Sequence, residues 1–392
     1  MNDPPRTVIV AGAGIGGLTA ALALAGTGFD VTMLEQAARF DTAGAGIQLS
    51  PNATRILIAL GLGDALAAVA TTPDSVTIRD ARSNAVLARV PLGTAVLARY
   101  GAPYWVLHRA DLQAVLAEAA GRAPRIALHL GQRVAGMAET ADGISCHTDA
   151  AAFHGDALVG ADGLWSQVRT LLHGREPPRF ARRVAWRATL DAAQVPASLR
   201  GMEVTLWLGR DAHVVAYPVR QGREVNVVAI RADARAPEGW SSARTREQMQ
   251  AALAPVRAAG ALRELLDIPG TWQVWGLYDR PPLPVWGRDA ATLLGDAAHP
   301  MLPFLAQGAG MAIEDAALLA TSLAGYRDPA AGLRAYERLR QRRTAAVQTA
   351  ARRQGRIYHL GGPEALARNI VMRMLDGPRL LARQDWIYRW IE

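Results

Sequence analysis

The chain has 392 residues, of which 50% are hydrophobic and 20% are charged, which is typical of a globular protein long enough for two domains. Cys146 is the only cysteine, so an intramolecular disulfide and a cysteine-cluster metal site are excluded, and no metal is expected. The net charge is +8 and every basic residue is arginine, but no basic run is interleaved with aromatic residues, so no nucleic acid partner is expected. Without a signal peptide or a run of about 18 uncharged apolar residues, we expect a cytoplasmic protein with no integral membrane association.

The first predicted unit is a strand, a glycine turn, a helix and a second strand. Thr7–Ala11 is a β-rich run, Leu18–Ala25 is typical of a buried helix, and Asp30–Leu34 is a second strand that ends at Glu35. Residues 12–17 (GAGIGG) fit G-x-G-x-x-G between the first strand and the helix. This order predicts a dinucleotide-binding unit of the Rossmann type, although it does not separate FAD from NAD.

Each residue type in this unit has a physical reason. Gly12 allows a tight turn, Gly14 lets the backbone approach a pyrophosphate, and Gly17 allows close packing of helix on strand. The free N–H groups at the helix start attract phosphate, and Glu35 can accept a hydrogen bond from a ribose hydroxyl. The predicted cofactor contacts in this unit are Gly12, Gly14, Gly16, Gly17 and Glu35.

The middle of the chain is rich in β-branched and aromatic residues, which predicts a mostly antiparallel sheet. The expected strands are Ser75–Arg79, Val86–Val90, Val184–Thr189, Val204–Leu208, Val214–Pro218, Val225–Arg231 and Thr271–Leu277. Residues 311–360 are expected to be helical. The arginine-rich tail with Trp386, Tyr388 and Trp390 is interpreted as helix that packs on the body or on a second subunit rather than on a membrane surface, so a homodimer stays open.

Two later segments each join a strand to a turn. Ala157–Gly160 leads into residues 161–169 (ADGLWSQVR), and Ala291–Leu294 leads into residues 295–300 (GDAAHP). Asp296 can bind a polyol hydroxyl, and the small residues at 308–310 (GAG) would let a flat ring lie on a helix start. The alternative is an ordinary strand–turn–helix junction in which Asp296 is a cap.

With GAGIGG and Glu35, these two segments, in this order, resemble the group A flavoprotein monooxygenases, the para-hydroxybenzoate-hydroxylase-like family, over nearly the whole chain. Residues 44–53 (GAGIQLSPNA), 100–112 (YGAPYWVLHRADL) and 385–392 (DWIYRWIE) are similar to segments of salicylate hydroxylases, 3-hydroxybenzoate 6-hydroxylases and 6-hydroxynicotinate 3-monooxygenases. The resemblance implies an α/β fold: a Rossmann-like FAD-binding domain of the GR2 type, with an inserted, mostly antiparallel substrate domain and C-terminal helices. The domains expected are residues 1–72, 100–176 and 281–330 for FAD, 73–99 and 177–280 for substrate, and 331–392 for the helical region.

The resemblance also implies the chemistry and its ligands. FAD would be the cofactor and NADH or NADPH the co-substrate, and oxygen activated at the flavin C4a position would hydroxylate a small aromatic ring. Because no second G-x-G-x-x-G follows a strand, no separate domain for the nicotinamide cofactor is expected. Further FAD contacts implied are Gln36, Gln48, Arg109, Leu130, Asp162, Asp296, Ala309 and Gly310.

His213 and Tyr217 are the candidate catalytic residues. They lie four apart on a predicted strand and so share one face, and the resemblance implies that their positions belong to the active site. A phenol reacts better as phenolate, so a histidine base near the ring is the favoured role, whereas a structural histidine is the alternative. His299 is interpreted as a turn residue, and Pro303 and Phe304 depart from the polar pocket residues of some relatives. Trp186, Trp207 and Tyr217 are candidates to line a flat apolar pocket, although aromatic residues in strands more often belong to the core.

Rival functions stay open. The first rival is a flavin-dependent halogenase, which resembles this family in its scaffold. Its chemistry relies on an active-site lysine, and this chain has no lysine. An NAD-dependent dehydrogenase would leave residues 295–311 unexplained, and a non-enzymatic FAD module is the third alternative. Within the family, an N-heteroaromatic or larger polycyclic substrate is the alternative to a hydroxybenzoate or salicylate, but Gln48 stands where nicotinate relatives have a histidine, which disfavours that substrate.

Overall fold

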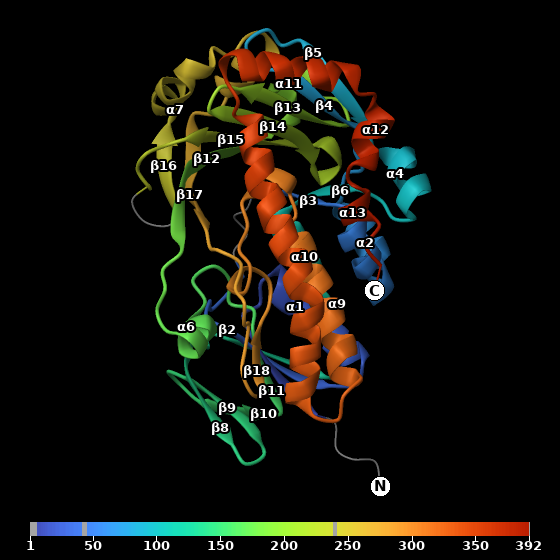
Figure 1. Ribbon diagram of the computed structural model, residues 1–392, viewed down its shortest axis with the longest axis vertical. Helices are drawn as coiled ribbons and strands as arrows, with labels where there is room; N and C mark the ends of the chain where they lie inside the picture. The colour runs from blue at the N-terminus through green and yellow to red at the C-terminus, as the bar shows by residue number, and fades with distance from the viewer. Residues whose placement is uncertain (1–5, 41–44, 238–240, 392) are drawn as a thin grey trace.

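The computed structural model describes residues 6–40, 45–237 and 241–391, so Gly44 and Glu392 of the family-like segments lie outside the described residues. Two sheets lie at opposite ends of the long axis, and a long helix, α10 (Pro329–Tyr358), runs between them (Figure 1). This arrangement places a cavity between the sheet with the glycine turn and the larger sheet.

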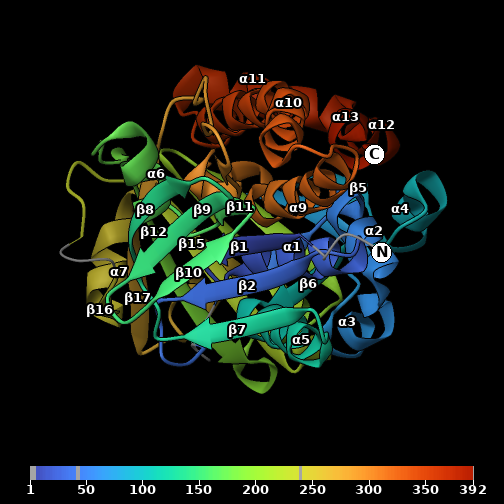
Figure 2. The same ribbon diagram turned by 90° about the horizontal axis from the view of Figure 1, so that it is seen from below.

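The sheet with the glycine turn is parallel and five-stranded. Its strands, in spatial order, are β18 (Ala291–Leu293), β11 (Ala157–Gly160), β1 (Thr7–Ala11), β2 (Asp30–Glu35) and β7 (Ile126–Leu130). The central strands are short apolar runs buried on both faces, as parallel strands covered by other elements usually are. Helices α1 (Ile15–Gly26), α5 (Arg109–Arg122) and α9 (Gly308–Ala324) pack at one face (Figure 2). A small antiparallel sheet packs beside β1 and β11 and consists of β8 (Val134–Thr140), β9 (Gly143–Thr148) and β10 (Ala152–Gly155).

The larger sheet has eight strands, and its neighbouring strands pair antiparallel except for β13 and β4, which are parallel. It confirms the prediction of a mostly antiparallel substrate domain. In spatial order the strands are β16 (Ser241–Thr245), β17 (Thr271–Asp279), β12 (Arg179–Asp191), β15 (Glu224–Ala232), β14 (Ala212–Val219), β13 (Glu203–Gly209), β4 (Ser75–Asp80) and β5 (Val86–Pro91). Sequence reasoning missed β16, α7 (Arg246–Leu253) and α8 (Ala261–Leu266). The two helices bury their apolar side chains against the outer face of the sheet.

The remaining elements connect or cover these layers. The strands β3 (Gly46–Leu49) and β6 (Trp105–His108) form an antiparallel pair, and a π-helical turn, Ile58–Leu62, joins α2 to α3. The other helices are α2 (Pro51–Leu57), α3 (Gly63–Val69), α4 (Gly93–Tyr100), α6 (Gln167–His173), α11 (Gly362–Met374), α12 (Gly377–Ala382) and α13 (Asp385–Tyr388).

Among the described residues, one helical run, Pro51–Val69, is long and apolar enough to cross a membrane by length and composition alone. It contains Arg55 and Asp64, so it is not the uncharged span considered in the sequence. Gly61, with a φ of +80°, interrupts its helical backbone.

A buried ionic cluster joins α9 to α10. Arg340 is fully buried and donates to Asp315 (2.6 Å) and Glu314 (2.7 Å), and Arg343 donates a further pair of hydrogen bonds to Glu314. Burial alone would raise the pKa of Asp315, but His299 and Arg340 outweigh it and lower that pKa to about 2. Because this pKa is below the ordinary value of 3.8, the stabilisation by this carboxylate is present above pH 3.8 and is lost as the pH falls towards 2.

The C-terminal tail covers the same cluster. The Trp390 ring lies 5.2 Å from the guanidinium carbons of both Arg340 and Arg343. Arg343 also donates to the carbonyl oxygens of Trp386 and Ile387, and Arg55 of α2 donates to that of Trp390 (2.8 Å). The segment from Trp386 to Trp390 is therefore fixed to this buried ionic cluster.

We predict that Arg340→Met lowers the free energy of unfolding by about 3–5 kcal/mol, because it removes the fully buried cation that both carboxylates share. Urea unfolding followed by circular dichroism measures the change. Arg342→Met is the matched control, since it removes the same charge from an exposed position on the same helix. Equal effects of the two substitutions would contradict a structural role for the cluster.

Candidate active site

The glycine turn between β1 and α1 has the geometry that its sequence predicts. Gly12 has a φ of +102°, and a Cβ there would lie 2.5 Å from the carbonyl oxygen of Ala161. A Cβ on Gly17 would lie 1.9 Å from the oxygen of Gly12, so the close approach of helix and strand requires glycine. Apart from Gly14 itself and its two neighbours in the chain, no atom of the described residues lies within 4 Å of the position of a Cβ on Gly14. The backbone is therefore open at the helix start, where a phosphate would bind.

Glu35 lies at the end of β2 and stabilises this turn by hydrogen bonding. Its carboxylate accepts hydrogen bonds from the backbone N–H of Ala13 (2.7 Å) and of Ala37 (2.8 Å), and its other lone pairs remain available to a ribose hydroxyl. Gln36 and Leu130 are exposed beside it, with Leu130 opposite Glu35 in the β2–β7 ladder. These side chains do not line the cavity between the two sheets, so their role as cofactor contacts stays a prediction.

A cavity of about 350 Å³ runs from the glycine turn to the inner face of the eight-stranded sheet. One side is formed by the start of α1, by β3, by the turn after β18 and by the start of α9. The other side is formed by β12, β14 and β15. The cavity thus lies where the two predicted domains meet, which is a common location for a cofactor and its substrate.

Asp296 is at the cavity side of the turn after β18. It lines the cavity and has no hydrogen-bond partner among the described residues. Burial raises the pKa of Asp296, whereas the nearby charges of His299 and Arg109 lower it. Arg109 lines the same cavity. An unpaired acceptor that is exposed at the cavity wall is suited to the hydroxyl groups of a bound polyol.

The start of α9 and strand β3 form the next part of the cavity wall. Ala309 lines the cavity, but Gly310 does not: a Cβ on Gly310 would lie 3.0 Å from the side-chain oxygen of Gln307, so its small size serves packing. Gln48 of β3 lines the cavity, and its side-chain oxygen accepts a hydrogen bond from the Tyr104 hydroxyl (2.6 Å).

The inner face of the sheet carries the candidate catalytic residues. His213, Val215 and Tyr217 alternate along β14 and all line the cavity, so the two candidates share the face on which alternation places them. Burial raises the pKa of Tyr217, which keeps its hydroxyl protonated at neutral pH. Its ring packs over Gly46, where a Cβ would lie 2.5 Å from a ring carbon.

Sequence reasoning missed Arg187, which lines the same cavity from β12. Its neighbours in the sheet are Val228 of β15 and Gln273 of β17. Its guanidinium carbon lies 5.2 Å from the Trp275 ring centre, and its Nε is buried without a hydrogen-bond partner among the described residues. Alternation along β12 from the core residue Trp186 would have placed Arg187 on the inner face, but not shown that it lacks a partner.

Asp162 has a structural use for its carboxylate. The side chain accepts hydrogen bonds from the Ser166 hydroxyl and from the backbone N–H groups of Gln167 (2.7 Å) and Val168 (3.0 Å), at the start of α6. Burial raises its pKa. Its neighbours at 161 and 163 line the cavity and Asp162 does not, so any contact of this motif with cofactor is made by backbone rather than by the carboxylate.

The other aromatic and turn residues are divided between core and cavity. Trp186 and Trp207 belong to the apolar core on the outer face of the sheet, which leaves Tyr217 as the one pocket candidate of the three that lines the cavity. Pro303 lines the cavity, and Phe304 packs behind it with its ring centre 5.6 Å from that of His213. The buried His299, through its Nε2, contacts Asp315 at 2.6 Å, as expected of a turn residue.

Together these features fit a dinucleotide that carries a flat ring. The open backbone at Gly14 suits phosphates, Asp296 suits a polyol, and small residues at the start of α9 leave room for an isoalloxazine. The backbone N–H groups at the start of α9 also favour negative charge on such a ring.

Known proteins match the chain along its length. Residues 6–353 match the FAD binding domain family. The 3-hydroxybenzoate 6-hydroxylase of Polaromonas naphthalenivorans (strain CJ2) is 37% identical over 100% of this chain and 98% of its own. The 3-amino-4-hydroxybenzoate 2-monooxygenase of Streptomyces cremeus is 38% identical over 99% of this chain and 96% of its own.

Solved structures of related proteins share the fold of this chain. Klebsiella pneumoniae HpxO complexed with FAD and uric acid matches with a TM-score of 0.86 and 29% identity, covering 96% of this chain and 95% of that one. A salicylate hydroxylase substrate complex matches with a TM-score of 0.83 and 26% identity, covering 99% and 96%. The chain therefore belongs to the FAD-dependent aromatic-ring monooxygenases, the para-hydroxybenzoate-hydroxylase-like family, with FAD as its cofactor.

Proposed function

We propose that this monooxygenase hydroxylates a small hydroxylated aromatic carboxylate of the hydroxybenzoate type, with NADH or NADPH and O₂ as co-substrates. The observation that carries the proposal is the guanidinium of Arg187, whose Nε is buried without a hydrogen-bond partner among the described residues, at the cavity that also holds His213 and Tyr217. Bound FAD supplies the oxygen chemistry, whereas the residues of this chain hold the ring, exclude water and supply charge.

Arg187 has the properties of a site for an anion. Among the described residues no carboxylate lies within ion-pair distance of it, and burial lowers its pKa, as does the charge of Arg109. A cation held this way is unfavourable until an anion neutralises it, so binding of a carboxylate gains from both charge and hydrogen bonds. The Trp275 ring at its guanidinium limits the directions in which Arg187 can point.

The sheet register gives the pocket two polar ends. Arg187 pairs with Val228 and Val228 pairs with Val215, so Arg187 and the His213 strand are separated by one strand, β15. Two strand spacings span about 10 Å, part of which the long arginine side chain crosses. The remaining gap suits one benzene ring, with its carboxylate at Arg187 and its hydroxyl towards His213.

The substrate class is tested by a panel assay. The purified protein is expected to show flavin absorbance and to oxidise NADH or NADPH faster with at least one of 3-hydroxybenzoate, salicylate and 4-hydroxybenzoate. The panel also contains 6-hydroxynicotinate as an N-heteroaromatic compound. Mass spectrometry of the product is expected to show one added oxygen. Urate is included because HpxO was solved with uric acid. Stimulation by urate or 6-hydroxynicotinate alone would contradict the hydroxybenzoate assignment and favour an N-heteroaromatic substrate.

We predict that Asp296→Ala weakens FAD binding by roughly 10- to 100-fold, because it removes a charged hydrogen-bond acceptor from the cofactor linker. Flavin fluorescence during dilution or dialysis measures the loss. Asp149→Ala, at an exposed position, is the control for the removal of one carboxylate. Full flavin occupancy in the Asp296 variant would refute the contact.

We predict that Arg187→Gln raises the KM for the hydroxybenzoate by roughly 10- to 100-fold and leaves the KM for its carboxamide analogue nearly unchanged. The comparison separates loss of the carboxylate contact from general damage to the pocket. FAD occupancy and the KM for NADH or NADPH serve as internal controls. If these change and the substrate KM does not, Arg187 binds a cofactor phosphate instead.

A further inference from the structure

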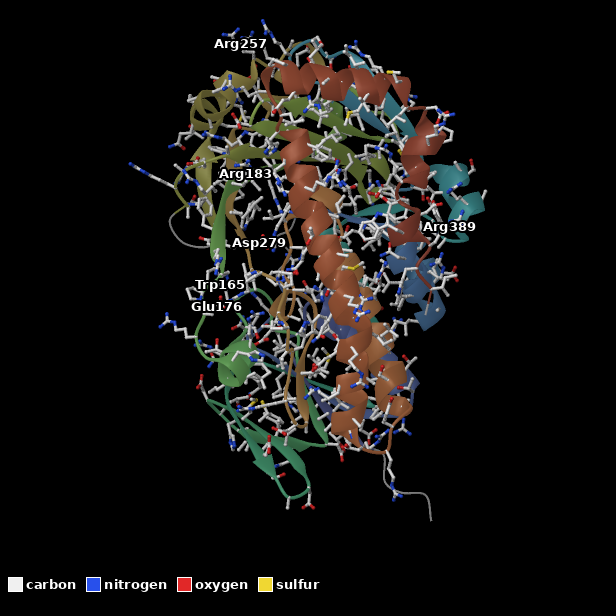
Figure 3. The ribbon with its side chains drawn as sticks, in the orientation of Figure 1. Trp165, Glu176, Arg183, Arg257, Asp279 and Arg389 are labelled. Atoms are coloured by element: carbon white, nitrogen blue, oxygen red, sulfur yellow. The ribbon has the colours of Figure 1, made fainter. Side chains whose placement is uncertain are left out.

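A pair of buried histidines lies behind the cavity. His213 lines the cavity from β14, and His359 follows the last residue of α10. The Nδ1 of His213 is 2.8 Å from the Nε2 of His359, and the Nδ1 of His359 is 3.1 Å from the Nε of Arg183 on β12. Figure 3 labels Arg183 on the side of the sheet domain next to α10. These contacts form a chain of hydrogen bonds from Arg183 through His359 to the active site.

The direction of this chain is set by Arg183. A guanidinium has N–H groups and no acceptor, so the Nδ1 of His359 must accept from it. A neutral His359 then carries its proton on Nε2 and donates to the Nδ1 of His213. A neutral His213 in turn carries its proton on Nε2. Since Nδ1 faces His359 and the ring lines the cavity, Nε2 is the nitrogen left to meet a ligand.

Both imidazoles are held in the neutral form. Burial lowers the pKa of His213 well below its ordinary value, and the neighbouring His359 and the charge of Arg183 act in the same direction. Burial lowers the pKa of His359 to about 3, with Arg183 and then Arg368 adding to the effect. Two carboxylates act on the cations of this group: Asp211 on Arg183 and Asp80 on Arg368.

The other neighbours of the pair do not titrate near neutral pH. Phe304 and Tyr358 place their rings beside His213, with centres 5.6 Å and 5.3 Å away, and burial raises the pKa of Tyr358. No carboxylate of the described residues accepts a hydrogen bond from either histidine, so nothing favours an imidazolium there.

We infer that His213 serves the reaction as a hydrogen-bond donor through Nε2–H, and that His359 and Arg183 are positioning residues that fix this tautomer. The inference rests on the proposed function, and it differs from the general-base role that the sequence favoured. A base would need a lone pair on Nε2 of His213, which shifts one proton to each Nδ1. The Nδ1–H of His359 would then face the N–H of Arg183, and two donors would oppose each other in a buried place.

The donor has a consequence for the substrate. An N–H directed at the hydroxyl of the ring stabilises the phenolate, which is the more nucleophilic form of the ring. The substrate thus binds as the anion, and its proton is left in solvent rather than on His213. With Arg187 at one end and the His213 N–H at the other, both ends of the pocket select negative charge.

The first test reads the tautomer directly. Nitrogen-15 NMR of the histidine rings in the FAD-loaded protein distinguishes Nδ1–H, Nε2–H and imidazolium forms, and the chain has only 8 histidines. His213→Gln and His359→Gln provide the assignments. Between about pH 6 and 9 we expect a neutral Nε2–H form for both rings. An Nδ1–H or imidazolium form of His213 overturns the inference.

Substitutions of Arg183 test the positioning role. Arg183→Met is expected to give a mixture of His213 tautomers, whereas Arg183→Lys, which keeps a donor without an acceptor, is expected to restore the single form. Arg182→Met is the matched control, because it removes the same charge from the adjacent exposed position. An unchanged tautomer in Arg183→Met means that Arg183 does not set it and refutes this part of the inference.

The second test measures the ionisation of a bound ligand. 4-Hydroxy-3-nitrobenzoate absorbs at different wavelengths as phenol and phenolate, and the FAD-loaded protein is expected to make the bound probe ionise at lower pH than the free probe. His213→Phe is expected to reduce the ionisation constant of the bound probe by roughly tenfold or more. If His213→Phe leaves it unchanged, no donation occurs.

The two proposals fail separately. Neither readout needs turnover, so a protein that keeps the Nε2–H form but hydroxylates nothing in the panel loses the proposed function alone. A protein that hydroxylates the benzoate with an Nδ1–H His213 loses this inference alone.

Discussion

Two carboxylates on α9 and the buried arginine on α10 that neutralises them hold the FAD side of the cavity in place. Asp315 accepts from Arg340 and also from the backbone N–H of Gly295, in the turn that carries the polyol acceptor. Glu314 accepts from Arg340 and from Asn52 of α2, directly after β3. Buried charges are tolerated only when their partners are complete. The relative placement of turn, α9 and β3 therefore depends on this one set of ion pairs.

Much of the fold followed from local sequence signals. The glycine turn, the acid at the end of β2 and the strands of the larger sheet were predicted from spacing and residue type, and alternation along β14 placed His213 and Tyr217 on one face. Residues 241–266 gave no such prediction, because the edge strand β16 and the short helices α7 and α8 are fixed by packing on the outer face of the sheet. Patterns within a segment carry little information on such contacts.

The predicted site shows the same division between local and distant information. Contacts within a motif, such as those of Gly12 and Glu35, were recognisable because the motif is itself the local structure. The hydrogen bond between His213 and His359 joins residues 146 positions apart. Whether Arg187 has a partner among the described residues depends on which side chains surround it in space, and those come from distant parts of the chain. Asp162 shows that a residue in a functional motif can serve the fold, since its carboxylate caps α6.

The C-terminal tail affects the buried ionic cluster between α9 and α10 by excluding solvent from it. Because the Trp390 ring covers the guanidinium groups of Arg340 and Arg343, it keeps water away from the ion pairs that they form with α9. Excluding water lowers the local permittivity, which strengthens the attraction between charges and also increases the penalty for any charge left unmatched. Residues at the end of the chain thereby set the dielectric environment in which the cofactor-binding turns are held together, without contacting the cofactor cavity themselves.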